Sequence, residues 1–310
     1  MFISQSTNFN TLKTCFYRAL TALAAILVFG LFNAAIFAQE AYTGDSWSSV
    51  QENKTGEITA VYLEEDAFAY TNEEGELTGI EIEIFQQFLN YLKNAKNINL
   101  DVNYVKKSES FGDFYNTVKN SSQGVFGLGT VTILERRKDE VQFTPPWINN
   151  VAVLVSHSSN PTLESMEELP EVFAGKTAII IENTTLENRI NELKNEYYPN
   201  LQTTSVNSQN AALDLVIEGE GDYFTYLDVA IFWPANQNGD PVKRHAVGDQ
   251  ASEVFGFILP KDSDWKPVFD EFFQLGGGYR SNPAYRKILI KHLGPEFTRM
   301  LEMARKKNNR

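Results

Sequence analysis

The stretch "GTVTILERRKDEVQFTPPW", residues 129–147, decides how the chain is interpreted. It begins as a Thr-containing strand, becomes charged at Glu135–Lys138, and ends in an aromatic segment with two prolines. A strand, a solvated helical turn and a loop would explain this pattern. A site for an anion would also explain it, because the Thr132 hydroxyl and the Arg137 guanidinium could together grip a carboxylate. In that case we expect the neighbouring Arg136 to face water.

Strand and helix patterns alternate through the rest of the chain. "EITAVYL" (57–63) reads as a strand, and residues 79–97 place apolar side chains at helical spacing. Similar units follow as far as the strand pattern at 254–260, and three helical stretches come after it, at 263–276, 282–294 and 294–307. Repeated strand–helix units predict the α/β class with largely parallel sheets.

Composition bounds the kind of protein. The chain has 310 residues, of which 43% are hydrophobic and 22% charged, as in ordinary globular proteins. This length accommodates two domains and a core that needs no disulfide or metal. The formal net charge of -13 disfavours nucleic-acid binding, which requires clustered Lys and Arg.

The N-terminus has the pattern of an export signal. Lys13 and Arg18 precede an apolar run at 19–38 that ends in small residues. We predict that residues 1–38 are a signal peptide removed on export, and that the protein is periplasmic. The alternative is an uncleaved anchor, since ~20 apolar residues span a bilayer. Cys15, the only cysteine, lies before the apolar run, so the remaining chain has no thiol.

Motifs for catalysis and metal binding are not found. "GKT" at 175–177 has Pro170 where a phosphate loop needs glycine, and it opens a strand pattern rather than a helix. The histidines lie far apart without ligand spacing, at His157, His245 and His292. We therefore expect a protein that is not an enzyme and that has neither cofactor nor metal.

Two further segments offer groups that suit a polar ligand. The loop at 64–79 carries Phe68 and Tyr70 near Glu65, although aromatics packed beneath a solvated acidic turn would look the same. "ENTTLENRI" (182–190) predicts a helix start.

The helix start at 182–190 has two interpretations. Asn183 and Thr184 would cap the helix, with Thr185 just inside it. The free N–H groups and the partial positive charge of a helix N-terminus suit an anion. Simple capping by the threonine pair explains the same residues.

In this order, the segments resemble the bacterial extracellular solute-binding proteins of family 3, the polar amino acid receptors of ABC importers. The fold of this family also forms the ligand core of ionotropic glutamate receptors. The opening stretch resembles the signature G-x-T-I-T-x-E-R…[VI]-D-F-[ST]-x-P-[YFW]. Aligning backwards from Phe143 selects Arg137 as the carboxylate-binding arginine and Thr132 as the contacting threonine. Further resemblance lies in "DAFAYTNEEGELTGIEIE", "NTTLE", "GEGDY" and "FGFILPKDSDW…YRKILIKHLG", and it covers about residues 57–294.

The resemblance implies a two-lobed periplasmic binding protein of type II, in which each lobe is a mostly parallel sheet flanked by helices. The large lobe would comprise residues 57–146 plus 255–310 and the small lobe residues 147–254. Two crossings, near 147–150 and 252–255, would form a hinge that closes on a ligand. The implied partners are a small-molecule ligand and an ABC permease in the inner membrane, and we expect a monomer.

Four positions depart from the family pattern. Leu134 replaces a threonine, and Asn183 replaces a glycine that precedes the threonine pair. The acid that binds the ligand amine is expected where Leu227 stands, with Asp228 one residue beyond, so either the strand bulges or the amine contact differs. Glu65 falls where the family often has an aromatic that stacks on the ligand.

These patterns together predict a receptor for a carboxylate-bearing, amino acid-like solute. An arginine, ornithine, lysine or small basic peptide would satisfy both the anion clamp and the acids. A ligand-sensing subunit and a dehydratase-like enzyme that uses Glu65 or Asp228 are the alternatives. The expected ligand-binding residues are Glu65, Phe68, Tyr70, Thr130, Thr132, Arg137, Asn183, Thr184, Thr185 and Asp228.

Overall fold

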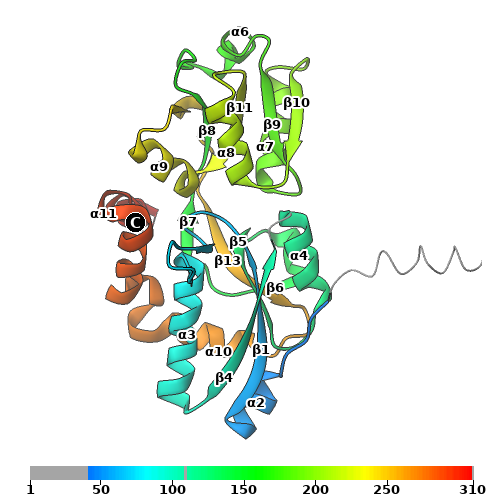
Figure 1. The fold of residues 1–310 in the computed structure, drawn as a ribbon, viewed down its shortest axis with the longest axis vertical. Helices are drawn as coiled ribbons and strands as arrows, with labels where there is room; N and C mark the ends of the chain where they lie inside the picture. Colours follow the sequence, from blue (N-terminus) through cyan, green and yellow to red (C-terminus); the bar gives the residue numbers. More distant parts are fainter. Residues whose placement is uncertain (1–40, 108–109, 309–310) are drawn as a thin grey trace, which may run out of the picture. The chain divides into compact units, whose positions relative to one another are not determined.

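The computed structural model describes residues 41–107 and 110–308, which form two sheets with their helices (Figure 1). The expected signal peptide at 1–38 lies outside the described residues. Across the described part of the chain, no helix combines the length and apolar character that a membrane crossing requires.

The first sheet combines parallel and antiparallel strands. β1 pairs in parallel with β4 and β5, whereas β13 runs antiparallel to β5, β6 and β7. The strands are β1 (Thr55–Leu63), β4 (Asn99–Lys107), β5 (Val125–Thr132), β6 (Val141–Phe143), β7 (Ile148–Asn150) and β13 (Glu253–Pro260).

The second sheet is also mixed. β9 pairs in parallel with β10 and β11, and β8 runs antiparallel to β11 and β12. The strands are β8 (Ala152–His157), β9 (Thr177–Ile181), β10 (Gln202–Val206), β11 (Tyr223–Asp228) and β12 (Val242–His245).

The predicted two-lobed α/β fold is confirmed, but the sheets are less parallel than expected. A parallel neighbour requires a long crossover connection, usually a helix. The chain enters the second sheet through β8 and re-enters the first through β13 without such a crossover, and both strands run antiparallel to their neighbours. Antiparallel pairing is therefore found beside the strands that connect the two sheets.

Helices of the first lobe pack on its sheet or on one another and bury aromatic side chains. They are α2 (Trp47–Asn53), α3 (Ile80–Lys96), α4 (Phe111–Asn120), α5 (Glu135–Lys138), α10 (Lys266–Gln274) and α11 (Pro283–Asn308). Between α3 and α10, the rings of Phe88 and Phe269 stack with centroids 3.8 Å apart. Phe126 of β5 and Trp265 meet edge to face beside them, so the strand and both helices share one core.

Helix α3 begins at a backbone position that requires glycine. Gly79 has φ 124, and a Cβ there would lie 2.2 Å from the carbonyl oxygen of Phe68. The helix ends at Asn97, which adopts a left-handed conformation. The predicted helix at 79–97 is thus confirmed with both its ends.

Helices of the second lobe are α6 (Leu169–Val172), α7 (Thr185–Glu196), α8 (Gln209–Glu218) and α9 (Val229–Asn238). Short 3-10 turns complete the chain at Met166–Glu168, Ala246–Gly248, Leu275–Gly277 and Tyr279–Ser281, and a small hairpin pairs β2 (Tyr70–Thr71) with β3 (Leu77–Thr78).

Strand pairing favours slightly different lobe limits from those expected. The chain leaves the first sheet after Asn150 and returns to it at Glu253. Because β7 pairs with β13, we propose that residues 147–150 belong to the first lobe. The division at 146/147 and 254/255 stays a prediction.

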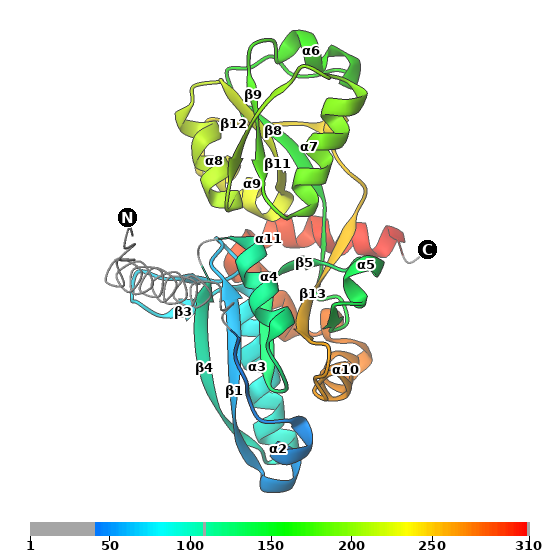
Figure 2. The same ribbon diagram turned by 90° about the vertical axis from the view of Figure 1, so that its right-hand side faces the viewer.

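The C-terminal helix touches both lobes. The two helical stretches predicted at 282–294 and 294–307 form α11, which is interrupted at Gly294, where φ is 79 and ψ is 164. Before this break α11 packs on α3, and after it the helix contacts α9 (Figure 2). In that contact Phe297 packs on Trp233 with ring centroids 5.4 Å apart.

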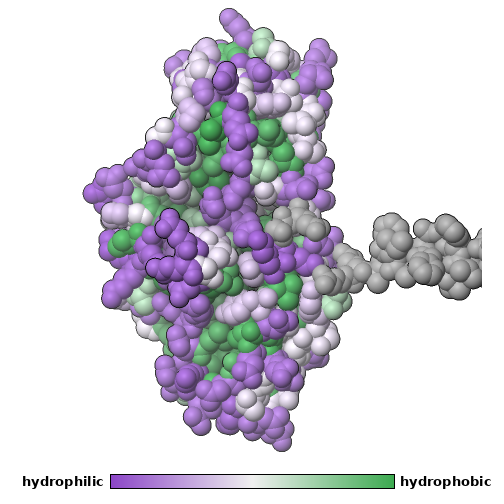
Figure 3. All heavy atoms as spheres, viewed as in Figure 1, coloured by the Kyte–Doolittle hydropathy of each residue, from purple (hydrophilic) through white to green (hydrophobic). Residues whose placement is uncertain are grey.

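Hydrophilic side chains cover most of the face drawn in Figure 3, with smaller apolar areas between them. Among the described residues, the large apolar side chains classed as exposed are Val247, Leu275, Met300 and Met303. The two methionines belong to the second half of α11.

Candidate functional site

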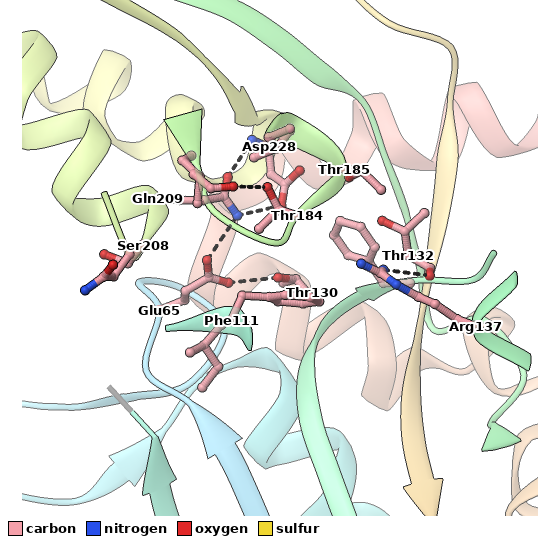
Figure 4. Close-up of a pocket in the computed structure, with 15 residues that line it drawn as sticks. Glu65, Phe111, Thr130, Thr132, Arg137, Thr184, Thr185, Ser208, Gln209 and Asp228 are labelled. Atoms are coloured by element: carbon pink, nitrogen blue, oxygen red, sulfur yellow. Dashed lines mark hydrogen bonds between the residues drawn. The ribbon is translucent and has the colours of Figure 1, made fainter. Parts of the chain in front are cut away.

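A cavity lies between the lobes, where the carboxyl ends of parallel strands from both sheets meet. Crevices at the carboxyl ends of strands are the usual ligand sites of open α/β sheets. The lining comprises Leu63, Glu65, Phe111, Thr130, Thr132, Arg137, Ile181, Thr184, Thr185, Leu186, Asn207, Ser208, Gln209, Asp228 and Phe255 (Figure 4).

The cavity is small in this arrangement of the lobes. Its volume is about 20 Å³, which is room for about one water molecule. An amino acid therefore enters only when the lobes separate or when side chains turn aside.

Arg137 supplies the positive charge of the cavity. Its side chain is 5% exposed, and its Nη1 donates a hydrogen bond of 3.2 Å to the Thr132 carbonyl oxygen. The guanidinium lies over the rings of Phe111 and Tyr115, 5.1 and 5.4 Å from their centroids. Arg136, by contrast, is exposed. The chain at this point turns from β5 into the short helix α5, which directs Arg137 inward.

Arg137 makes no salt bridge with any carboxylate of residues 41–107 and 110–308. Glu253, the carboxylate whose charge affects the Arg137 pKa most, is paired with Arg189 at 3.2 Å instead. Burial lowers its pKa, although a guanidinium stays charged in proteins. A buried charge without an opposite partner is costly, so this position favours an anion.

The start of α7 faces the same cavity. Thr184 caps the helix by accepting a hydrogen bond of 3.3 Å from the backbone N–H of Glu187. The Glu187 side chain accepts one of 2.7 Å from the Asn183 N–H, which completes a reciprocal cap. Capping by Thr184 is thus present, and Thr184 and Thr185 also line the cavity.

Asn183 adopts a left-handed conformation with φ 65, which asparagine tolerates where the family has glycine. Its side chain lies close to Gly112 of the first lobe, because a Cβ on that glycine would be 2.9 Å from the amide nitrogen. Asn183 belongs to the contact between the lobes and is not part of the cavity lining.

Two buried carboxylates occupy the other end of the cavity. Glu65, 3% exposed, accepts hydrogen bonds from the Thr130 hydroxyl at 2.9 Å and from Gln209 Nε2 at 3.0 Å. Asp228, 4% exposed, accepts from Asn150 Nδ2 at 2.6 Å and from Gln209 Nε2 at 2.7 Å. One acid from each lobe therefore meets the same glutamine.

Burial determines the protonation of these acids. It raises the pKa of Glu65 to about 7, and hydrogen bonds from Thr130 and Gln209 offset part of the rise. It also raises the pKa of Asp228 well above the ordinary value, with further contributions from the charges of Glu253 and Glu65. The donors to both acids that the described residues supply are neutral, so this end of the cavity suits a cation.

A third buried acid stands behind Glu65. Glu81, in the first turn of α3, has no exposed surface, and neither carboxylate oxygen has a hydrogen-bond partner among the described residues. Burial raises its pKa, and the charge of Glu65 adds to the rise. Glu81 does not line the cavity, but it increases the local surplus of acidic groups.

Phe68 and Tyr70 lie outside the cavity lining. Phe68 is 1% exposed and packs in the core, edge to face with Trp147 at 6.0 Å. The Tyr70 hydroxyl is 3.1 Å from His292 Nδ1. The loop folds back through a bridge between Glu65 and Ala69, which turns Glu65 toward the cavity and both aromatics away from it.

Of the two alternatives for Asp228, a bulged strand or a different amine contact, the bulge is not observed. β11 pairs with β8 without interruption from Phe224 to Asp228, and Asp228 reaches the cavity as the last residue of the strand. The cavity also includes Phe111, Ser208 and Gln209, which are not among the residues predicted to bind the ligand. A helix start at Ser208 could have been recognised by its capping residue.

Across residues 41–107 and 110–308, no group of three or more His, Cys, Asp or Glu side chains is placed to hold a metal ion. The arrangement is therefore one cation and two acids across a small cavity, flanked by hydroxyl groups and by the start of a helix.

The family model for bacterial extracellular solute-binding proteins, family 3, matches residues 58–294, and the chain belongs to this family. The resemblance drawn from the motifs is thereby confirmed. No curated protein sequence matches the chain.

Solved structures share the fold at low sequence identity. A putative L-cystine ABC transporter from Listeria monocytogenes has a TM-score of 0.62 at 17% identity, over 77% of this chain and 97% of that one. The arginine-, lysine-, histidine-binding protein ArtJ from Geobacillus stearothermophilus gives 0.58 at 19%, over 78% and 98%. An ancestral amino acid-binding protein, a precursor of cyclohexadienyl dehydratase, gives 0.60 at 15%, over 79% and 98%.

Proposed function

We propose that the chain is an extracytoplasmic receptor that binds one small amino acid-like solute between its lobes and delivers it, as a monomer, to an ABC permease. The observation that carries this proposal is the buried Arg137, which has no acid partner among the described residues and faces a cavity with two buried acids at its other end. A guanidinium at one end and, at the other, two acids that a ligand cation would hold ionised suit a zwitterion.

The ligand carboxylate would bind Arg137, with Thr132 and the start of α7 as further donors. A charged hydrogen bond to guanidinium is short and directional, and a helix N-terminus favours an anion. The ligand cation would face Glu65 and Asp228. Thr130 would act through Glu65, to which it donates a hydrogen bond.

Two acids allow a ligand with two positive charges, such as arginine, ornithine or lysine. The name of the similar Geobacillus protein includes arginine and lysine, which agrees with this preference, although likeness at 19% identity speaks for the fold alone. Calorimetric titration with arginine, glutamate, glutamine and phenylalanine tests the preference. Tighter binding of glutamate than of arginine would contradict it.

The test of the carboxylate grip compares Arg137→Ala with Arg136→Ala in the purified, ligand-free protein. A hydrogen bond to a charged group contributes ~1.5–3 kcal/mol. Loss of Arg137 should therefore weaken arginine binding about tenfold or more. Arg136→Ala is the matched control, because Arg136 is exposed and adjacent. Equal effects of the two substitutions would refute the assignment.

A dehydratase-like activity is the second candidate, because one observation favours it. Glu65 is a buried acid in the cavity with its pKa raised to about 7, which suits a general acid near neutral pH. One of the similar structures is a precursor of a dehydratase. Incubation with prephenate or arogenate, followed by NMR, distinguishes the two candidates, since a receptor leaves both compounds unchanged.

A further inference from the structure

Gln209 is the first residue of α8, and Ser208 caps this helix. The glutamine is 4% exposed, and each polar atom of its side chain is used. Nε2 donates to Glu65 Oε1 at 3.0 Å and to Asp228 Oδ2 at 2.7 Å. Oε1 accepts from the backbone N–H of Asp228 at 2.7 Å.

These partners fix the orientation of the amide. If the group were reversed, the amide NH₂ would face the Asp228 N–H and its carbonyl oxygen would face two carboxyl groups. The donor side of Gln209 must therefore point at the acids, as Figure 4 shows.

The hydrogen bonds from Gln209 to Glu65 and Asp228, called the bridge below, also join the lobes. Glu65 follows β1 of the first sheet, whereas Gln209 and Asp228 belong to the second lobe. The hydrogen bond from Gln209 to Glu65 therefore crosses the cavity at the position where a ligand cation would contact Glu65.

We propose that Gln209 is a specificity-determining residue. Its amide is the protein's own hydrogen-bond donor between Glu65 and Asp228, and a ligand cation takes the place of this donor at Glu65. This inference rests on the proposed function for the ligand, but the bridge between the lobes stands without it. A ligand that carries a cation gains contacts with two acids and displaces one hydrogen bond, the one from the Gln209 amide to Glu65. A ligand without a cation leaves the bridge in place and gains neither acid.

In the ligand-free protein, the hydrogen bond from Gln209 to Glu65 opposes ligand entry. With the bridge intact, the lobes are held together around a cavity of about 20 Å³, which is too small for an amino acid. The hydrogen bond between Gln209 and Glu65 must therefore break when a ligand enters. The stronger this hydrogen bond is, the lower the apparent affinity of the protein for the ligand.

The test compares Gln209→Ala and the shorter amide Gln209→Asn with the control Gln87→Ala. Gln87 is a partly buried glutamine whose side chain accepts from Tyr279 within the first lobe. The first readout is the distance between spin labels on the two lobes, measured by double electron–electron resonance without ligand. The labels are attached through Asn94→Cys on α3 and Asn191→Cys on α7, both exposed, in a Cys15→Ser background.

We expect both Gln209 variants to lengthen the distance between the lobes and Gln87→Ala to leave it unchanged. The second readout is calorimetric titration with arginine. A hydrogen bond to a charged group contributes ~1.5–3 kcal/mol, so Gln209→Ala should tighten arginine binding about tenfold. Gln209→Asn should move the affinity in the same direction.

Unchanged label distances in both variants would overturn the inference, and so would a tenfold loss of arginine affinity in both. If the unaltered protein binds none of arginine, glutamate, glutamine and phenylalanine, the proposed function fails. The distances between the spin labels then test by themselves whether the bridge holds the lobes together.

Discussion

Replacing Glu65 by glutamine should stabilise the protein at alkaline pH and leave it almost unchanged at acid pH. Glu65 is 3% exposed, and burial raises its pKa from 4.5 to about 7. The folded protein therefore holds this proton more tightly than the unfolded chain does. The free energy of unfolding consequently falls as the pH rises from the unfolded pKa to the folded one.

The size of the effect follows from the two pKa values. Their difference is about 7 minus 4.5, or about 2.5. At ~1.36 kcal/mol for each pKa unit, the ionised glutamate costs roughly 3 kcal/mol of stability above pH 7. Glutamine keeps the shape and can hydrogen-bond with both Thr130 and Gln209, but it never ionises.

Urea unfolding of both proteins between pH 4 and pH 8 measures this difference. We expect equal stability near pH 4 and an advantage of roughly 3 kcal/mol for Glu65→Gln near pH 8. Glu64→Gln is the matched control, because Glu64 is the adjacent acid and is paired at the surface with Lys106 at 2.5 Å. A difference between Glu65→Gln and the unaltered protein that stays constant over this range would refute the reasoning.

Two further predictions concern export and the fold. Residues 1–38 should be missing from protein recovered from its native envelope, and intact mass spectrometry would reveal a full-length species if this is wrong. Gly79→Ala should cost about 2 kcal/mol or more in urea unfolding, because a Cβ would lie 2.2 Å from the Phe68 carbonyl oxygen and φ is 124. Gly75→Ala is the control, with φ 83 and nothing within 4 Å of its Cβ, and should cost only about 1 kcal/mol; an equal cost would contradict the steric argument.

Much of the fold was predictable because its longer elements carry clear periodicity. The helix at 79–97 and the strand at 57–63 repeat apolar residues at their own spacing, and both are present. Short antiparallel strands such as β7 and β12 are set by pairing with distant strands rather than by local pattern. The mixed character of both sheets follows from those pairings and was therefore not predictable locally.

The residues of the candidate site also differ in whether the sequence alone can predict them. Arg137 follows a strand end at a spacing that can be counted, and the structure brings it to the cavity. Gln209 gave no comparable signal, since its importance arises where α8 meets a loop 144 residues away. The sequence leaves the orientation of Phe68 and Tyr70 open, because an aromatic in a loop can face a ligand or the core. The β-bridge between Glu65 and Ala69, which local sequence does not predict, turns both away from the cavity.

The break at Gly294 gives the molecule a further attachment between its lobes, besides the two connecting strands and the hydrogen bond from Gln209 to Glu65. Phe297 is 2% exposed where it packs on Trp233. Any rotation that parts α9 from α11 must expose this ring, and burying such a side chain contributes roughly 1.5–3 kcal/mol. Separation of α9 from α11 would therefore carry this cost in addition to that of the hydrogen bonds across the cavity.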